Sequence, residues 1–132
     1  MSDENETLVR TAYEAYGQGD TTPLLALVHP DLEWTYLDPA FPDPEPQTCH
    51  GRPELLRALE RQARSGLTSQ VEEVAAHGDK IMLVVRTPGL DQRRLRQAGD
   101  RNYLVLTLRQ QQIVAMRACR DRAEAAAFAG LA

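Results

Sequence analysis

The stretch TSQVEEVAAHGDKIMLVVRT, residues 68–87, decides the fold of this chain. Residues 68–76 and 80–87 are rich in apolar and β-branched side chains, which favour strands. Between them, His77-Gly78-Asp79 is typical of a tight turn, because glycine and aspartate tolerate the backbone angles that a hairpin needs. The stretch therefore predicts two antiparallel strands joined by a hairpin.

A second pair of strands is expected further along the chain. Residues 102–109 and 113–120 are again apolar and meet at a glutamine turn, after a polar, arginine-rich connection over residues 88–100. Asp121 and Glu124 then form a capping box, which satisfies free backbone N–H groups at the start of a helix. This pattern predicts a short last helix that runs to residue 131.

Helices are expected in the first part of the chain. Residues 5–17 place apolar side chains at helical spacing and end at a glycine-rich turn. A second short helix follows, with Thr22 as its expected cap and Pro23 in its first turn. His29-Pro30 is expected to end that helix, because the residue before a proline avoids helical angles.

A strand is predicted directly after these helices. Residues 32–38 alternate in polarity, with Trp34, Tyr36 and Asp38 on one face, which is typical of a half-buried strand. Four prolines within residues 39–46 exclude regular structure there, so this segment is expected to be a stiff surface loop.

A third helix is expected to open at residues 51–53 and to stop at Gly66. The predicted order is thus α-α-β-α-β-β-β-β-α, without a repeat or linker, so residues 1–132 form a single domain. Early helices and a later antiparallel meander predict the α+β class, with a curved antiparallel sheet wrapped around the N-terminal helices. Such a sheet leaves a hollow at one end, which is a common ligand site.

Charge and composition exclude some classes of function. The net charge of −4 argues against a general nucleic-acid-binding protein, which needs a basic face. No apolar run is long enough to span a bilayer and no signal peptide is recognisable, so a cytoplasmic location away from membranes is expected. Cys49 and Cys119 show no disulfide framework, although a disulfide between them stays an alternative.

The strands predict a homodimer. Apolar residues occupy both faces of the segments 81–85 and 104–108, whereas the predicted helices cover only one face of the sheet. A second copy of the chain is the simplest cover for the other apolar face.

Several short motifs occur in a fixed order along the chain. They are Gly19-Asp20 between the first helices, the strand over 32–36, His50-Gly51-Arg52 before the third helix, and Ile113-Val114-Ala115-Met116-Arg117 followed by residues 120–125. In this order the chain resembles, over nearly all its length, the nuclear transport factor 2-like superfamily, which includes SnoaL-like polyketide cyclases and ketosteroid isomerase. The resemblance implies a cone-shaped, usually dimeric fold whose pocket serves different purposes in different members, so it does not decide the chemistry.

Asp38 is the candidate catalytic residue. On the aromatic face of its strand a carboxyl group loses hydration, which raises its pKa and suits it to remove a proton next to a carbonyl. Asp38-Pro39 also resembles the Asp-Pro that carries the base in ketosteroid isomerases. The alternative, which the residue pattern favours, is that an aspartate before a proline caps a local turn.

The isomerase pattern itself is incomplete. By the same resemblance, the oxyanion-hole tyrosine falls on Ala12, with Tyr13 next to it, and the late-strand acid falls near Leu104. No acid lies between Asn102 and Cys119, and losing one oxyanion donor lowers a rate about a hundredfold or more. A true ketosteroid isomerase is therefore not expected. The late acid of SnoaL-type cyclases and the Asp-Arg-Asp set of limonene epoxide hydrolases are not recognisable either.

The candidate ligand-binding residues are four aromatic residues from the first third of the chain, Tyr13, Tyr16, Trp34 and Tyr36, together with His50 and Met116. Aromatic rings around a pocket can stack on a planar ligand, and packing in a core or interface is the alternative. His50, at the entrance to the third helix, could donate to a ligand at the pocket mouth.

No metal or organic cofactor is expected, because the three histidines have no metal-ligand spacing with each other or with the cysteines. Arg93, Arg94 and Arg96 form a basic run that is typical of a solvated loop. An anionic ligand at this run is an alternative that no other feature of the sequence supports.

Three hypotheses on function follow. The first is a SnoaL-like protein that binds a small hydrophobic ligand, as an isomerase- or cyclase-type enzyme with Asp38 as general base acting on a hydrophobic carbonyl or polycyclic compound. The second is a non-catalytic ligand-binding or dimeric partner protein of the same fold. The third is a purely structural dimerisation domain, which predicts a pocket filled by side chains.

Overall fold

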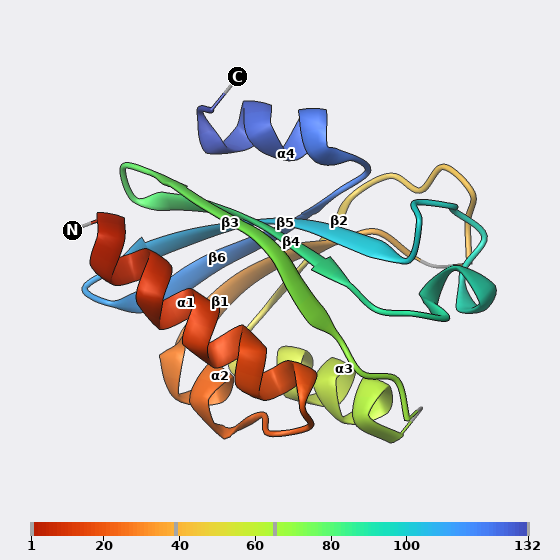
Figure 1. The fold of residues 1–132 in the computed structure, drawn as a ribbon, viewed down its shortest axis with the longest axis horizontal. Coiled ribbons are helices and arrows are strands. Elements are labelled where there is room, and N and C mark those ends of the chain that lie inside the picture. The colour runs from red at the N-terminus through yellow and green to blue at the C-terminus, as the bar shows by residue number, and fades with distance from the viewer. Residues whose placement is uncertain (1, 39, 65, 132) are drawn as a thin grey trace.

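The computed structural model describes residues 2–38, 40–64 and 66–131, and its helices lie on both sides of a curved sheet (Figure 1). In chain order the elements are α1 (Ser2–Gly17), α2 (Thr22–Leu27), β1 (Val28–Tyr36), β2 (Gln47–His50), α3 (Arg52–Arg64), β3 (Gln70–His77), β4 (Lys80–Arg86), the 3-10 helix η1 (Leu90–Arg93), β5 (Arg101–Arg109), β6 (Gln112–Cys119) and α4 (Arg122–Ala129). The α+β class, the N-terminal helices and the late meander are therefore confirmed.

The sheet has six strands in the order β2-β1-β6-β5-β4-β3. The predicted hairpins β3–β4 and β5–β6 are antiparallel, but β1 pairs with β6 in parallel, with Trp34 opposite Met116. The sheet is thus mixed and not purely antiparallel as predicted. The reason is that β1 and β6 are far apart in sequence, so helices and strands carry the chain between them and no hairpin sets their direction.

Two elements were missed by the sequence prediction. Strand β2 follows the proline-rich segment and pairs with β1, so that His50 lies opposite Glu33. The helix η1 lies inside the connection that was expected to be irregular. Both are short elements whose backbone is organised by neighbouring segments, and local propensity gives little sign of either.

Helix α1 packs along β3 because its apolar side chains recur at helical spacing. Val9, Ala12 and Tyr13 are buried, and Glu6 accepts a hydrogen bond from the backbone N–H of Ala76 on β3 at 2.8 Å. The helix ends at Gly17, where a Cβ would lie 2.2 Å from the carbonyl oxygen of Ser69. Only glycine therefore allows α1 to end this close to the segment that leads into β3.

The passage from α2 to β1 differs from the prediction. Thr22 is a helical residue whose N–H donates to Asp20, and Thr21 is the cap, without a side-chain hydrogen bond. His29-Pro30 lies inside β1 and does not end α2. The strand accommodates the proline because its pairing with β6 is irregular between Val28 and Glu33, and proline needs such an interruption.

The main core lies between the concave face of the sheet and helices α1, α2 and α3 (Figure 1). Its fully buried side chains come from both layers: Val9, Leu24, Val28, Leu32, Ile81, Leu83, Leu106 and Ile113.

Helix α4 covers the opposite, convex face of the sheet, where it contacts β4, β5 and β6 (Figure 1). Its alanines 125, 126 and 129 pack on Met82, Val105 and Cys119. The predicted capping box is confirmed, since Asp121 accepts a hydrogen bond from the N–H of Glu124 at 2.8 Å. The dimer prediction assumed a bare second face, and α4 removes that premise. A homodimer stays a prediction, which a dimer mass in light scattering at micromolar concentration would support and a monomer mass would contradict.

Neither cysteine is in a disulfide, and burial raises the pKa of the Cys119 thiol to about 11. Among the helices of the described residues, none combines the length and apolar character of a bilayer-spanning segment.

Candidate functional site

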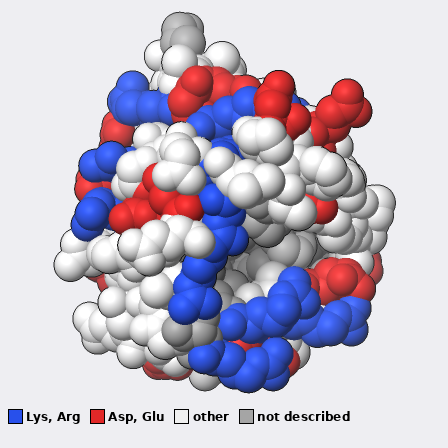
Figure 2. Space-filling view, turned by 90° about the vertical axis from the view of Figure 1, so that its right-hand side faces the viewer, with Lys and Arg blue, Asp and Glu red and all other residues white. Residues whose placement is uncertain are grey.

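A cavity of about 420 Å³ opens at one end of the cone. It is bounded by the concave face of the sheet, the end of α1, helix α3 and the segment 88–100 that contains η1. Figure 2 looks into this hollow and shows Lys and Arg side chains along its rim. The hollow predicted from the fold is therefore present, and it is open.

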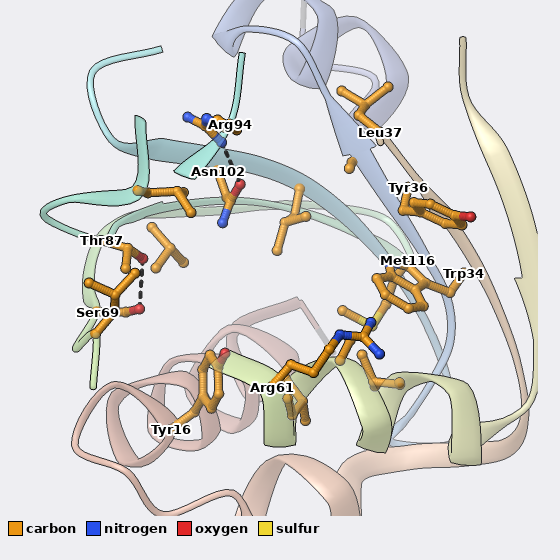
Figure 3. Close-up of a pocket in the computed structure, with 18 of the residues that line it drawn as sticks. Tyr16, Trp34, Tyr36, Leu37, Arg61, Ser69, Thr87, Arg94, Asn102 and Met116 are labelled. Atoms are coloured by element: carbon orange, nitrogen blue, oxygen red, sulfur yellow. Dashed lines mark hydrogen bonds between the residues drawn. The ribbon is translucent and has the colours of Figure 1, made fainter. Parts of the chain in front are cut away.

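Aromatic and apolar side chains make most of the cavity wall (Figure 3). Trp34 and Tyr36 come from alternate positions of β1, and their ring centroids lie 5.3 Å apart at an angle of 40°. Met116 lies beside them on β6, and Leu104 faces the cavity from β5. The wall offers an apolar, aromatic surface to a ligand.

Two tyrosines from α1 complete the apolar wall. Tyr13 and Tyr16 form an edge-to-face pair with ring centroids 6.1 Å apart. Burial raises the pKa of both phenols well above its ordinary value, and for Tyr13 the neighbouring Tyr16 adds to the rise, so both are hydrogen-bond donors at neutral pH. The hydroxyl of Tyr13 is buried without a partner among the described residues, and that of Tyr16 points into the cavity (Figure 3).

Polar side chains line the part of the wall formed by the segments next to β3 and β4. The hydroxyls of Ser69 and Thr87 form a hydrogen bond of 2.7 Å (Figure 3). Asn102, at the start of β5, accepts a hydrogen bond on Oδ1 from Arg94 at 3.1 Å. This bond fixes the orientation of the amide, and its nitrogen points into the cavity (Figure 3).

Arg94 anchors the segment 88–100 above the cavity. Its side chain is almost fully buried and is held by the Asp91 carboxylate, with Nε at 2.9 Å and Nη2 at 2.8 Å from Oδ1. Nη2 also donates to the carbonyl of Arg101 at 2.7 Å. The prediction of a solvated loop is therefore wrong for Arg94, because these acceptors replace water around its guanidinium.

The contact with Arg94 also affects the protonation of Asp91. Burial acts to raise the pKa of the Asp91 carboxyl, but hydrogen bonds from backbone N–H groups and the charge of Arg94 hold it below its ordinary value. One of the backbone bonds comes from Ala98 to Oδ2 at 3.0 Å. Asp91 is therefore a carboxylate at neutral pH and neutralises Arg94.

Five of the seven site residues predicted from the sequence line the cavity: Tyr13, Tyr16, Trp34, Tyr36 and Met116. Asp38 and His50 are not among the lining residues. Oδ1 of Asp38 accepts a hydrogen bond from the N–H of Ala40 at 2.9 Å, and the neighbouring Leu37 lines the cavity instead. The parity of β1 stops at Tyr36, where the strand ends, so it does not carry Asp38 onto the aromatic face. His50 is exposed at the end of the edge strand β2.

Sequence reasoning missed the polar lining residues. Thr87 continues the inward positions of Ile81, Leu83 and Val85, and Asn102 precedes Leu104 at the same parity, so strand alternation could have placed both inside. No comparable signal exists for Arg61, Arg93, Arg94 and Arg96, which also line the cavity. Among the described residues, no cluster of three or more His, Cys, Asp or Glu side chains is placed to hold a metal ion.

Helices wrapped in a curved mixed sheet, with a cavity at the open end, define a nuclear transport factor 2-like fold. The chain belongs to the SnoaL-like domain family, whose profile matches residues 9–116. The resemblance expected from the sequence motifs is therefore confirmed at the level of family and fold. No curated protein sequence matches the chain.

Solved structures with this fold include an "ntf2-like protein of unknown function" from Burkholderia pseudomallei K96243, which is 25% identical, with 98% of each chain covered and a TM-score of 0.64. A "putative polyketide cyclase" from Sinorhizobium meliloti is 17% identical over 86% of this chain and 94% of that one, with a TM-score of 0.62. A "putative ketosteroid isomerase" from Kribbella flavida is 13% identical over 89% of this chain and 77% of that one, with a TM-score of 0.61.

Proposed function

We propose that this protein binds a small, largely apolar molecule inside the cone cavity. The observation that carries the proposal is the open cavity of about 420 Å³, which has an aromatic wall and a few converging polar groups. Ligand sites in proteins typically have volumes of about 300–1,000 Å³ and this combination of wall and polar groups. The SnoaL-like fold typically binds small molecules, which agrees with this function.

Unpartnered polar atoms in the cavity wall support a ligand. The Tyr13 hydroxyl and Arg96 Nε are both buried without a hydrogen-bond partner among the described residues, and both residues line the cavity. A buried polar group without a partner costs about 1–3 kcal/mol. A wall that is packed for stability alone has no reason to keep such a cost, so these atoms favour a wall that serves a ligand. A purely structural dimerisation domain predicts a pocket filled by side chains, and the open cavity does not agree with that prediction.

Binding of N-phenyl-1-naphthylamine, a neutral apolar dye that fluoresces in a dry site, tests this function. We expect the wild-type protein to bind the dye with a micromolar Kd. Ala118 lines the cavity from β6, and Ala118→Phe places a ring in the hollow. We expect this variant to weaken binding by at least about tenfold, equivalent to 1.4 kcal/mol.

The matched control is Ala127→Phe, because Ala127 is exposed on α4, on the other side of the sheet. This variant should bind the dye like the wild type. A wild-type protein that does not bind the dye, or equal losses in both variants, would contradict binding in the cavity.

A catalytic extension of this proposal uses Asp38 as general base in an isomerase- or cyclase-type reaction on a hydrophobic carbonyl compound, without a metal or organic cofactor. Its support is position, since Asp38 directly follows Leu37, which lines the cavity. One carboxylate oxygen of Asp38 is used by the local turn, however, through its bond with Ala40. Binding without catalysis is therefore the function that the geometry supports best.

Hydrogen–deuterium exchange next to the carbonyl of 2-tetralone, followed by NMR in D₂O, separates the two versions. Asp38→Asn keeps the oxygen that accepts from Ala40, so the turn is retained. If Asp38 is a general base, the wild type accelerates the exchange, and the exchange rate with Asp38→Asn is at least about a hundredfold lower. Equal rates in the two proteins, with dye binding intact, would assign Asp38 to the turn alone.

A further inference from the structure

We propose that the cavity selects apolar carboxylates, and that Arg96 receives the acidic group of the ligand. This inference rests on the proposed binding function and adds the chemical class of the ligand. It takes up the alternative of an anionic ligand at the run Arg93, Arg94, Arg96.

The charge of the cavity is opposite to that of the whole chain. The chain has a net charge of −4, yet the described residues that line the cavity include four arginines and no carboxylate. The arginines are Arg61 from α3 and Arg93, Arg94 and Arg96 from the segment 88–100. Figure 2 shows how basic side chains gather along the rim of the hollow. A cavity with positive charges and low-dielectric walls concentrates anions.

Arg94 is not the ligand group, because the protein already neutralises it. Its Nε and Nη2 contact the Asp91 carboxylate, and its Nη1 donates to Asn102. The second oxygen of Asp91 accepts from the backbone of Ala98. Arg94 and Asp91 thus form a closed pair that holds the segment 88–100 in place.

Among the described residues that line the cavity, Arg96 is an arginine with a buried guanidinium nitrogen and no ion pair. Its Nε is buried and has no hydrogen-bond partner, and within the described part of the chain its guanidinium is in no ion pair. Burial lowers the pKa of Arg96 from its ordinary value, and the positive charges of Arg94 and Arg120 lower it further, against the opposite effect of Asp91. The guanidinium is still protonated at neutral pH, so it is a cation in an unfavourable environment.

A carboxylate bound at Arg96 would relieve this environment. A guanidinium presents paired N–H donors whose spacing matches the two oxygens of a carboxylate. The amide nitrogen of Asn102 and the hydroxyl of Tyr16 point into the same cavity and supply further donors (Figure 3). The Trp34–Tyr36 pair and Met116 offer the apolar surface for the rest of the ligand. Because no carboxylate of the described residues lines the cavity to compete for these donors, they favour a ligand carboxylate over its neutral analogue.

Competition between two matched compounds tests the inference. 2-Naphthoate and 2-naphthamide share one ring system and differ in charge, and each displaces bound N-phenyl-1-naphthylamine if it enters the cavity. We expect the wild type to bind the carboxylate at least about tenfold more tightly than the amide, and Arg96→Gln to abolish this preference while keeping its affinity for the amide. Arg96→Lys keeps the charge but not the paired donors, and should retain part of the preference.

The matched control is Arg109→Gln. Arg109 is exposed at the end of β5 next to the β5–β6 turn, outside the cavity lining, so its loss changes the net charge of the chain by the same amount. This variant should keep the full preference for the carboxylate.

Three outcomes would overturn the inference: equal affinity of the wild type for both compounds, an unchanged preference in Arg96→Gln, or an equal loss of preference in Arg109→Gln. 2-Naphthyl phosphate serves as a further competitor, and tighter binding of the phosphate than of the carboxylate would overturn the assignment to carboxylates. Failure of the dye itself to bind would instead overturn the proposed function, so the two failures are distinguishable.

Discussion

The concave face of the sheet has a filled end and an open end, and strand β5 contributes to both. Leu106 has no exposed surface and packs in the core under α1 and α2, whereas Leu104, two residues earlier on the same face, lines the cavity. The apolar pattern of the strand is the same at both ends. The difference comes from the cover: helices fill one end with apolar side chains, whereas at the other end α3, the end of α1 and the arginine-rich segment 88–100 surround an open cavity. An apolar strand therefore predicts an apolar wall, but it does not predict whether that wall is covered by packed side chains or left open.

The largest expected effect comes from removing the same side chain at the two ends. Leu106→Ala leaves a new void in a packed core and should lower the free energy of unfolding by about 2–5 kcal/mol. Leu104→Ala only enlarges an existing cavity and should lower the free energy of unfolding by less than about 1.5 kcal/mol. Urea unfolding of both variants measures the difference. Equal losses would mean that the cavity is closed in solution.

Arg94→Gln tests whether polar bonds hold the open end together. The substitution removes the ion pair with Asp91 and the bond to the Arg101 carbonyl, so the free energy of unfolding should fall by about 2 kcal/mol. Hydrogen exchange should become faster in the segment 88–100 and stay unchanged around Leu106. Arg109→Gln, an exposed arginine, is the control and should change the stability by less than about 0.5 kcal/mol. Faster hydrogen exchange over the whole protein would contradict a role of Arg94 that is limited to the segment 88–100.

The smallest expected effect concerns pH. The pKa of Asp91 is held below its ordinary value, so its contribution to stability is complete above the unfolded pKa of about 3.9 and is lost as the pH falls through the folded value. Asp91→Asn should therefore be less stable than the wild type at neutral pH, and the gap should narrow below about pH 4. The urea unfolding midpoints of the wild type and of Asp91→Asn, at neutral pH and below about pH 4, measure this difference in stability. A constant gap would show that the charge of Asp91 does not contribute.

Strand periodicity and turn residues predicted most of the fold and the apolar part of the site. Trp34 and Tyr36 were placed on one face of their strand because side chains alternate along a strand, and both line the cavity. Asp38 lies one step beyond the end of β1, where that alternation no longer applies, and its carboxylate is used by the turn. The parallel pairing of β1 with β6, the strand β2 and the cover by α4 depend on contacts between distant segments, which local pattern does not contain.

The class of fold, the family and the aromatic wall could be predicted from the amino-acid sequence, since they depend on patterns that repeat along neighbouring residues. The state of the two neighbouring arginines follows instead from contacts between distant segments: Arg94 is neutralised, and Arg96 lines the cavity without an ion pair among the described residues. Arg94 and Arg96 are two residues apart and look alike in the sequence. Asp91, Asn102 and the Arg101 carbonyl accept hydrogen bonds from the first, whereas Nε of the second is buried without a partner among the described residues. The strength of a charge at a site depends on acceptors within a few ångströms, and the fold alone brings those together.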